Sequence, residues 1–144
     1  MKELRTEIEI EASAEHVWQL LTDLASFPQW NPFIRQATGE ARVGARLEVF
    51  IQPSGARGMT FKPKVLKAEP NRELRWRGRL IMPGLFEGEH VFNIDALGAN
   101  RVRFTQREVF TGVLVPLFAR GLDTDTRRGF EEMNLALKER AERQ

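Results

Sequence analysis

The chain has 144 residues, of which 42% are hydrophobic and 29% charged, and this length fits one domain with a substantial core. Without cysteine, the sequence excludes disulfides, thiolate nucleophiles, thiolate metal sites and thiol redox chemistry. The 22 basic and 20 acidic residues nearly balance, which is not a nucleic-acid footprint. No apolar run approaches the roughly 18 residues that span a bilayer, and residues 1–7 lack a secretory apolar segment. We therefore expect a soluble, cytoplasmic protein.

The first thirty-three residues predict one strand and two short helices. Residues 2–11 alternate between apolar and charged side chains, which is typical of a half-buried strand. Ser13 can cap a following helix whose apolar residues recur at helical spacing up to Leu24. Pro28 and Pro32 then leave room for only one further helical turn.

Turn signals recur at strand-like intervals from residue 34 to residue 111, and every connection between the predicted strands is short. Short connections require antiparallel pairing, so these strands and the first one predict a curved, seven-stranded antiparallel sheet. The six later strands are expected near 35–38, 45–52, 59–67, 73–81, 85–96 and 101–111.

Two hairpin loops set the register of the last three strands. If residues 82–84 form a three-residue loop, Ile81 faces Leu85 and two arginines face two glutamates. This register predicts the pairs Arg79 with Glu87, Arg77 with Glu89 and Trp76 with His90.

A loop at residues 98–100 likewise predicts four further pairs: Ala96 with Val102, Ile94 with Phe104, Phe92 with Gln106 and His90 with Glu108. A slip by two residues would instead give His90 the neighbour Gln106. In either register a small polar group of His90, Gln106 and Glu108 lies inside an otherwise apolar face of the sheet.

The last part of the chain, residues 113–144, predicts a long helix with an interrupted start. Its apolar residues recur every three or four positions, so they form one stripe that needs a surface to cover. We expect Pro116 and Gly121 to break the helix and to form its most adjustable edge. The stripe consists of Leu117, Phe118, Leu122, Phe130, Met133, Asn134 and Leu137.

Several segments of this chain resemble the START-like helix-grip superfamily (SRPBCC), and within it the polyketide cyclase/dehydrase and lipid-transport branch. The resemblance is carried by the order of elements and by residues 12–18, 20–23, 27–32 and 130–138. It implies one α+β domain over residues 1–144, in which a curved sheet wraps around the C-terminal helix. It also implies a deep hydrophobic cavity between them. The superfamily has no shared catalytic motif, so no catalytic residue is transferred.

His90, Glu108 and Gln106 are the sharpest candidates for chemistry. A carboxylate beside a histidine orients the ring and favours its charged form, and such a pair in an apolar pocket could enolise a ketone. Alternatively, the three side chains satisfy one another and polarise one end of a binding cavity. Because an unpaired buried glutamate is costly, we expect His90 or Gln106 to bind Glu108.

A set of mostly aromatic residues, together with the polar residues of the sheet and helix, is predicted to bind a ligand. Phe118, Phe130 and Met133 should roof the cavity, and Asn134 should be its polar contact there, with a partner that is either protein or ligand. The full set is Trp30, Phe33, Phe61, Trp76, Phe86, His90, Phe92, Phe104, Gln106, Glu108, Phe118, Phe130, Met133 and Asn134.

The expected function is binding of a small hydrophobic or aromatic molecule, lipid-like or polyketide-like, as a carrier or sequestering protein. The alternative is a cofactor-free cyclase or dehydrase in which His90 and Glu108 handle protons. A third possibility is a protein-interaction module that uses a basic outer sheet face. We expect no cofactor and no nucleic-acid partner, and a monomer or homodimer. We expect no metal, because neither His16 nor His90 has a ligand-spaced companion.

Overall fold

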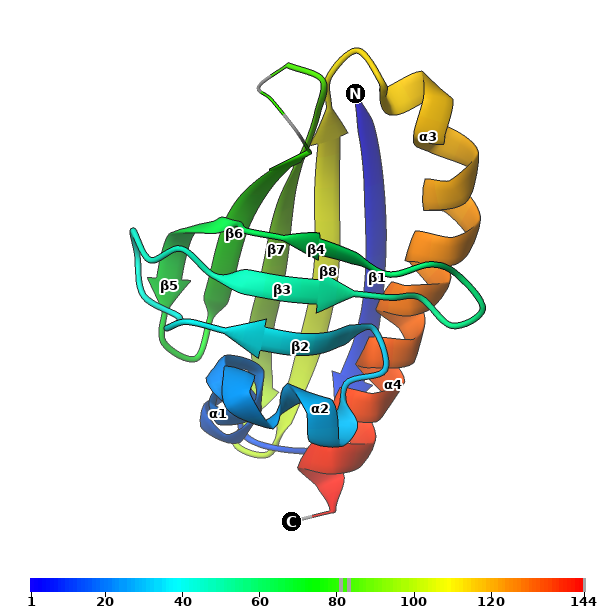
Figure 1. The fold of residues 1–144 in the computed structure, drawn as a ribbon. Helices are drawn as coiled ribbons and strands as arrows, with labels where there is room; N and C mark the ends of the chain where they lie inside the picture. Colours follow the sequence, from blue (N-terminus) through cyan, green and yellow to red (C-terminus); the bar gives the residue numbers. More distant parts are fainter. Residues whose placement is uncertain (81, 83, 144) are drawn as a thin grey trace.

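A computed structural model of the chain describes residues 1–80, 82 and 84–143. The elements follow in the order strand, two helices, seven strands and a long C-terminal helical segment (Figure 1). Their bounds are β1 Lys2–Ile10, α1 Ala14–Thr22, the 3-10 helix η1 Leu24–Ser26, α2 Phe27–Trp30, β2 Ile34–Thr38, β3 Glu48–Ile51, β4 Met59–Phe61, β5 Lys64–Glu69, β6 Glu73–Leu80, β7 Phe86–Gly98, β8 Arg101–Thr111, α3 Val115–Gly121, the π-helical turn η2 Leu122–Thr126, and α4 Arg127–Glu142.

The predicted α+β class and antiparallel pairing are confirmed, but the strands form two sheets instead of one. A five-stranded sheet has the order β1-β8-β7-β6-β5, and a three-stranded sheet β2-β3-β4 crosses in front of it (Figure 1). The strand predicted at 59–67 divides into β4 and β5 at Pro63, because proline has no N–H to donate to a ladder. The sheets stay joined there, since the Leu47 N–H donates to the Pro63 carbonyl at 2.8 Å.

The predicted register of β6, β7 and β8 is confirmed for the described residues. Across β6 and β7, Trp76 pairs with His90, and the two predicted arginine–glutamate pairs also align. Across β7 and β8, His90 pairs with Glu108 and Phe92 with Gln106. The predicted contact of Ile81 with Leu85 lies outside the described residues.

The C-terminal helical segment runs from α3 through η2 into α4 without leaving helical dihedral angles at the junctions. Pro116 does not break it, because proline in the first turn removes an N–H that has no helical partner anyway. The irregular part is instead η2, directly after Gly121. Leu117 was wrongly placed on the buried stripe, since it is 73% exposed. Leu122 and the four stripe residues of α4 are buried as predicted: Phe130, Met133, Asn134 and Leu137.

Phe33, just before β2, makes an aromatic contact with α4. Its ring packs edge-on against Phe130, with ring centroids 5.6 Å apart. A Cβ atom at Gly129 would lie 2.2 Å from the Phe33 ring, so only glycine lets this ring rest on the helix. The core is therefore closely packed between α4 and the chain segment that enters β2.

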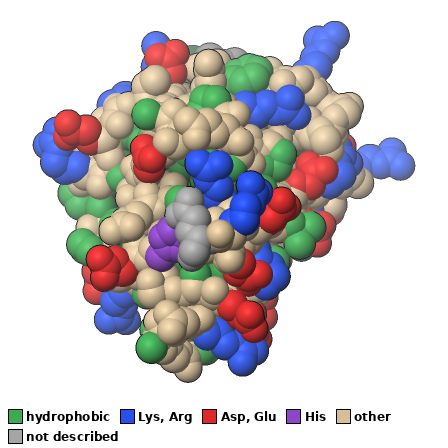
Figure 2. Space-filling model, turned by 90° about the horizontal axis from the view of Figure 1, so that it is seen from below, with side chains coloured by type: hydrophobic (Ala, Val, Ile, Leu, Met, Phe, Trp, Pro, Cys, Tyr) green, Lys and Arg blue, Asp and Glu red, His purple; other side chains and the backbone are tan. Residues whose placement is uncertain are grey.

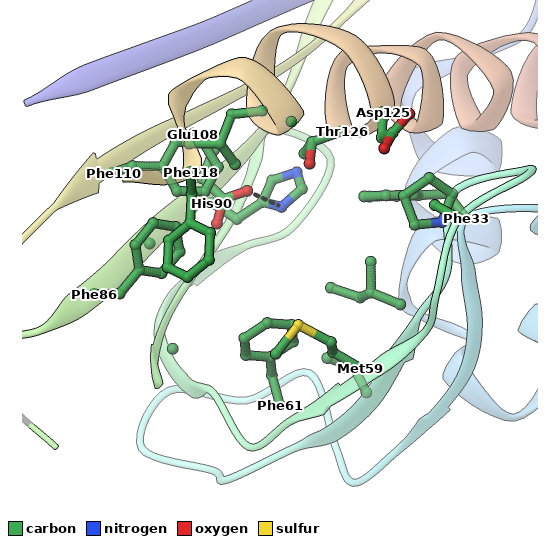
Figure 3. A pocket seen from close by; sticks show the side chains of 18 of the residues that line it. Phe33, Met59, Phe61, Phe86, His90, Glu108, Phe110, Phe118, Asp125 and Thr126 are labelled. Atoms are coloured by element: carbon green, nitrogen blue, oxygen red, sulfur yellow. Dashed lines mark ion pairs between the residues drawn. The ribbon is translucent and has the colours of Figure 1, made fainter. Parts of the chain in front are cut away.

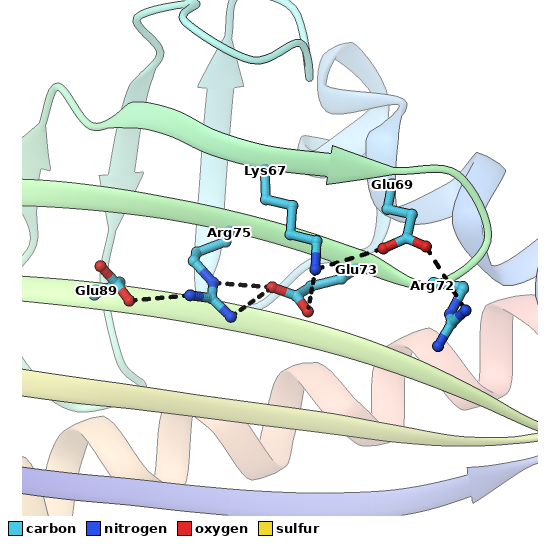
Figure 4. A network of polar contacts seen from close by, with 6 residues as sticks. All are labelled: Lys67, Glu69, Arg72, Glu73, Arg75 and Glu89. Atoms are coloured by element: carbon cyan, nitrogen blue, oxygen red, sulfur yellow. Dashed lines mark hydrogen bonds and ion pairs between the residues drawn. The ribbon is translucent and has the colours of Figure 1, made fainter.

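Ion pairs cover much of the outer face of the five-stranded sheet. Arg75 contacts Glu73 at 2.7 Å and Glu89 at 3.5 Å, within a network that continues to Lys67 (Figure 4). Arg79 pairs with Glu87 at 2.8 Å. Seen from below, basic and acidic side chains are interspersed over the surface (Figure 2). Of the helices in the described residues, none combines the length and the apolar character needed to cross a bilayer.

Candidate functional site

A cavity of about 340 Å³ lies between the three-stranded sheet, the neighbouring ends of β6, β7 and β8, and the helical segment α3–η2 (Figure 3). Its lining is mostly apolar, with aromatic rings from Phe86, Phe110 and Phe118 on one side and Met59 and Phe61 on the other (Figure 3). The lining residues are Phe33, Val49, Ile51, Pro53, Ala56, Arg57, Met59, Phe61, Pro63, Trp76, Gly78, Phe86, Gly88, His90, Glu108, Phe110, Phe118, Gly121, Leu122, Asp125 and Thr126.

Two glycines open space on the sheet side of this cavity. Gly78 in β6 and Gly88 in β7 are direct partners across the ladder, so two adjacent positions lack side chains. A glycine inside a strand weakens it, and commonly marks a place where another group approaches closely. Here the approaching group is a carboxyl, because a Cβ atom at Gly88 would lie 2.3 Å from Glu108 Oε2. The glycine pair thus provides both the volume and the room for Glu108.

Glu108 and His90 form the polar centre of the cavity wall. His90 Nδ1 lies 3.5 Å from Glu108 Oε1, and their side chains are 1% and 16% exposed. Burial raises the pKa of Glu108 from 4.5 to about 8. Burial also lowers the pKa of His90 from 6.5 to about 3, although its hydrogen bond to Gln106 acts in the opposite direction. These two shifts favour a carboxylic acid and a neutral imidazole near neutral pH, in place of the charged imidazole of the acid–base interpretation.

A chain of hydrogen bonds continues from His90 into the core. His90 Nε2 lies 2.9 Å from Gln106 Oε1, and Gln106 Nε2 donates to Asn134 Oδ1 at 2.8 Å. Asn134 Nδ2 then donates to Thr6 Oγ1 at 3.0 Å. The partners of Asn134 are thus protein groups, and it does not line the cavity. Of the two neighbours considered for His90, Glu108 is its ladder partner and lies 3.5 Å away, whereas Gln106 is its hydrogen-bond partner.

The sequence profile of the family described as polyketide cyclase / dehydrase and lipid transport matches residues 1–142. The chain belongs to this family. Among solved structures, it is similar to the Zhui aromatase/cyclase from a Streptomyces species, with a TM-score of 0.79 and 18% identity over 99% of this chain and 94% of that one. It is also similar to a START superfamily protein from Mycobacterium smegmatis, with a TM-score of 0.74 and 21% identity over 98% of this chain and 97% of that one.

The di-domain ARO/CYC protein BexL, from the BE-7585A biosynthetic pathway, shares the fold as well, with a TM-score of 0.74 and 15% identity. The match covers 95% of this chain but 46% of BexL, so the chain spans about half of that protein. Among curated proteins, no sequence matches this chain. The family and these structures confirm the START-like helix-grip fold.

Half of the predicted ligand-binding residues line the cavity, namely Phe33, Phe61, Trp76, Phe86, His90, Glu108 and Phe118. Four others, Phe92, Phe104, Phe130 and Met133, are buried in the core beyond it. Gln106 and Asn134 are buried behind His90, and Trp30 packs against Phe27 in α2 with ring centroids 5.2 Å apart. The six buried residues lie in the part of the interior that is filled where Phe33 packs against Phe130.

The sequence interpretation missed several lining residues on the crossing sheet and on η2. Met59 and Arg57 precede or begin the short edge strand β4, while Asp125 and Thr126 lie in the π-helical turn. The mid-strand glycines were a usable signal, since glycine inside a strand pattern indicates a bulge or a close approach. The η2 residues carried no comparable signal, because π-helical turns follow from packing and not from a residue pattern. Within the described residues, no group of three or more acidic or histidine side chains could hold a metal ion.

Proposed function

We propose that the protein binds a small, uncharged hydrophobic or aromatic molecule in this cavity and acts as a carrier or sequestering protein for it. The observation that carries the proposal is an aromatic-lined cavity of about 340 Å³ whose wall holds the Glu108 carboxyl, with a pKa raised by burial. Ligand pockets for drug-sized molecules typically measure about 300–1,000 Å³ and combine apolar walls with a few polar groups. A compact ligand of one or two rings suits the volume.

The wall chemistry also favours one kind of polar group on the ligand. A protonated Glu108 donates a hydrogen bond, so it favours an acceptor such as a ketone carbonyl. An anionic ligand would have to give up its hydration in an apolar cavity, beside a carboxyl that burial already keeps uncharged. We therefore expect neutral ketones to bind more tightly than hydrocarbons of the same shape, and carboxylates to bind least.

Three naphthalene compounds separate these expectations: 2-acetylnaphthalene, naphthalene and 2-naphthoate. Trp76 lines the cavity, so its fluorescence should report binding. The chain has two other tryptophans, and Trp76→Phe shows how much of the fluorescence change comes from Trp76. One neutral hydrogen bond contributes about 0.5–1.5 kcal/mol, so the ketone should bind about 2- to 10-fold tighter than naphthalene. Glu108→Leu should remove this preference.

Native mass spectrometry of the purified protein provides an independent measurement, since a carrier should retain a co-purifying apolar ligand. The proposal is wrong if none of the three compounds binds and no such ligand is found. Equal binding of 2-naphthoate and the ketone would instead contradict the proposed role of Glu108.

The second candidate function is a cofactor-free cyclase or dehydrase, and the Glu108–His90 contact of 3.5 Å is the observation that favours it. The protonated Glu108 can give its proton to the carbonyl oxygen of a bound ketone, and the neutral His90 can take a proton from the α-carbon, which yields the enol. Proton transfer from His90 to Glu108 then restores both side chains. The cavity would contribute mainly by holding the substrate in a reactive geometry. The outer sheet face supports a docking function less well, because Arg75 and Arg79 are paired with glutamates.

Deuterium exchange tests the enzyme candidate without knowledge of the natural substrate. In D2O the methyl group of bound 2-acetylnaphthalene should incorporate deuterium through its enol, which proton NMR detects as signal loss. His90→Ala and Glu108→Gln should abolish this exchange and leave ketone affinity within a few-fold of the wild type. If exchange is no faster than in buffer, the cyclase or dehydrase proposal fails and the carrier proposal stands alone.

A further inference from the structure

The imidazole of His90 is packed against two aromatic rings. Phe92 stacks on it with ring centroids 4.1 Å apart and planes 15° from parallel. Phe130 from α4 covers it at 4.9 Å. A buried ring packed against two aromatic rings in a close-packed core cannot turn over without displacing its neighbours. The two ring nitrogens therefore keep distinct neighbours, with Nε2 toward Gln106 and Nδ1 toward Glu108.

The backbone of α4 fixes which end of the Gln106 amide faces His90. Gln106 Nε2 lies 3.3 Å from the carbonyl oxygen of Phe130, and a carbonyl can only accept a hydrogen bond. The NH₂ end of the amide must therefore face α4, and its oxygen must face His90. Because that oxygen can only accept, His90 Nε2 must carry the hydrogen.

The chain beyond Gln106 supports the same orientation. The Gln106 NH₂ group also donates to Asn134 Oδ1 at 2.8 Å, which leaves the Asn134 NH₂ group to donate to Thr6 at 3.0 Å. All donations run in one direction, from His90 in β7 through β8 and α4 to β1. Gln106 and Asn134 are 0% and 3% exposed, so water does not compete for these amides.

We infer that Gln106, Asn134 and Thr6 are positioning residues that hold His90 as its Nε2–H tautomer, with the Nδ1 lone pair directed at Glu108. A Glu108 carboxylate would then face this lone pair at 3.5 Å, which is repulsive, and a proton moved to the ring would place two opposite charges in an apolar wall. The arrangement therefore favours the protonated carboxyl. The single carboxyl proton faces Nδ1 without ligand and can turn to the carbonyl oxygen of a bound ketone, which makes Glu108 the proton donor of the cavity. The consequence for ligand choice rests on the proposed function, whereas the tautomer does not.

The other charged residues that line the cavity are Arg57, from the loop before β4, and Asp125, from η2. Asp125 is paired with Arg128 at 3.0 Å, and the Arg57 side chain is exposed to solvent. Both are therefore solvated or paired, which leaves Glu108 and His90 to set the protonation of this part of the wall.

Nitrogen-15 NMR of the histidine side chains tests the tautomer directly, in the protein without ligand. The chain has two histidines, so His16→Gln assigns the signals. Near neutral pH we expect His90 to be protonated at Nε2 and unprotonated at Nδ1. The carbon-13 chemical shift of the Glu108 carboxyl should be that of a protonated acid. A His90 protonated at Nδ1, alone or at both nitrogens, would overturn the inference whatever the variants do.

Three variants test the positioning residues. Gln106→Met should move the proton to Nδ1, lower the titration midpoint of Glu108 and reduce the preference for 2-acetylnaphthalene over naphthalene to about 1. Thr6→Val should produce the same changes to a smaller degree. Thr105→Val is the matched control, since Thr105 is buried on β8 but lies next to Gln106 and so points to the opposite side of the sheet.

The inference is wrong if Gln106→Met keeps the wild-type tautomer and leaves the Glu108 titration unchanged. Should Gln106→Met fail to fold, the comparison of Thr6→Val with Thr105→Val decides. Equal effects of these two variants on Glu108 would also overturn it. If the expected tautomer is present but none of the naphthalene compounds binds and no apolar ligand co-purifies, the proposed function is wrong and the positioning residues stand.

Discussion

The C-terminal helical segment covers two different interiors. Under α4, the side chains of Phe130, Met133 and Leu137 are all 0% exposed and belong to a filled core. Under α3 and η2, Phe118 is 38% exposed and borders the cavity together with Leu122. The same helical stripe therefore packs on a filled core along α4 and borders a cavity along α3 and η2.

The opposing surfaces explain this difference. Opposite the filled end, the sheet presents large side chains, including Phe92 and Phe104, both fully buried. Toward the cavity end, the Gly78–Gly88 pair presents no side chains at all. A helical stripe shows which side of a helix faces inward, but the residues across the gap decide whether the space is filled.

Replacing an aromatic residue at each end should show the contrast most strongly. Phe130→Ala deletes a fully buried ring that contacts Phe33, so the free energy of unfolding should fall by about 3–5 kcal/mol. Phe118→Ala deletes a partly exposed ring beside Phe86 and should cost less than about 2 kcal/mol, while weakening the binding of 2-acetylnaphthalene. Urea unfolding and fluorescence titration measure the two quantities. Equal losses of stability would show that both ends are packed alike.

Gly78 and Gly88 allow a sharper comparison, because only Gly88 has Glu108 as a close neighbour. Gly88→Ala would place a Cβ atom 2.3 Å from Glu108 Oε2, so the carboxyl must move and stability should fall by about 1–3 kcal/mol. Gly78→Ala meets Pro63 at an ordinary 3.7 Å and should leave stability within about 1 kcal/mol of the wild type. Both fill the cavity, but only Gly88→Ala should also abolish the preference for ketone over hydrocarbon. If both variants keep that preference, Gly88 does not position Glu108.

The sequence predicted the order of elements, the register of β6 to β8 and the inward face of α4, because these depend on local periodicity and turn residues. It could not separate Phe118 from Phe130, since both occupy the same stripe and the difference lies in residues far along the chain. The divided sheet was predictable in principle from Pro63, a proline inside a strand pattern. The charge states of His90 and Glu108 were not, because they depend on how completely the fold removes both groups from water.

The burial of His90 and Glu108 should also make the free energy of unfolding depend on pH. In the folded protein the pKa of His90 is about 3, below its value of 6.5 outside the fold, so stability should rise with pH from about 3. The pKa of Glu108 is about 8, above its unfolded value of 4.5, so its contribution is lost progressively from about pH 4.5 to about 8. The two slopes oppose one another between 4.5 and 6.5. Stability should therefore rise, level off, and fall above about pH 6.5.

Urea unfolding at a series of pH values measures this profile, and two variants separate its arms. Glu108→Gln should remove the decline above about pH 6.5, because the amide does not titrate. His90→Gln should remove part of the rise at acid pH. A decline of unchanged size in Glu108→Gln would assign it to another group and contradict the protonated carboxyl.

The smallest expected effect concerns the loop between β3 and β4, which joins the cavity wall to α4. Ser54 Oγ donates to Glu132 Oε2 at 2.9 Å, and Arg128 donates to both the hydroxyl and the carbonyl of Ser54. Ser54→Ala removes the hydroxyl but keeps the contact with the carbonyl, so stability should fall by about 0.5–1.5 kcal/mol. Because Pro53 and Ala56 line the cavity, 2-acetylnaphthalene should also dissociate faster. Thr60→Ala, on the exposed face of β4, is the control, and stopped-flow fluorescence that finds the same dissociation rate in both variants would show that this anchor does not hold the wall.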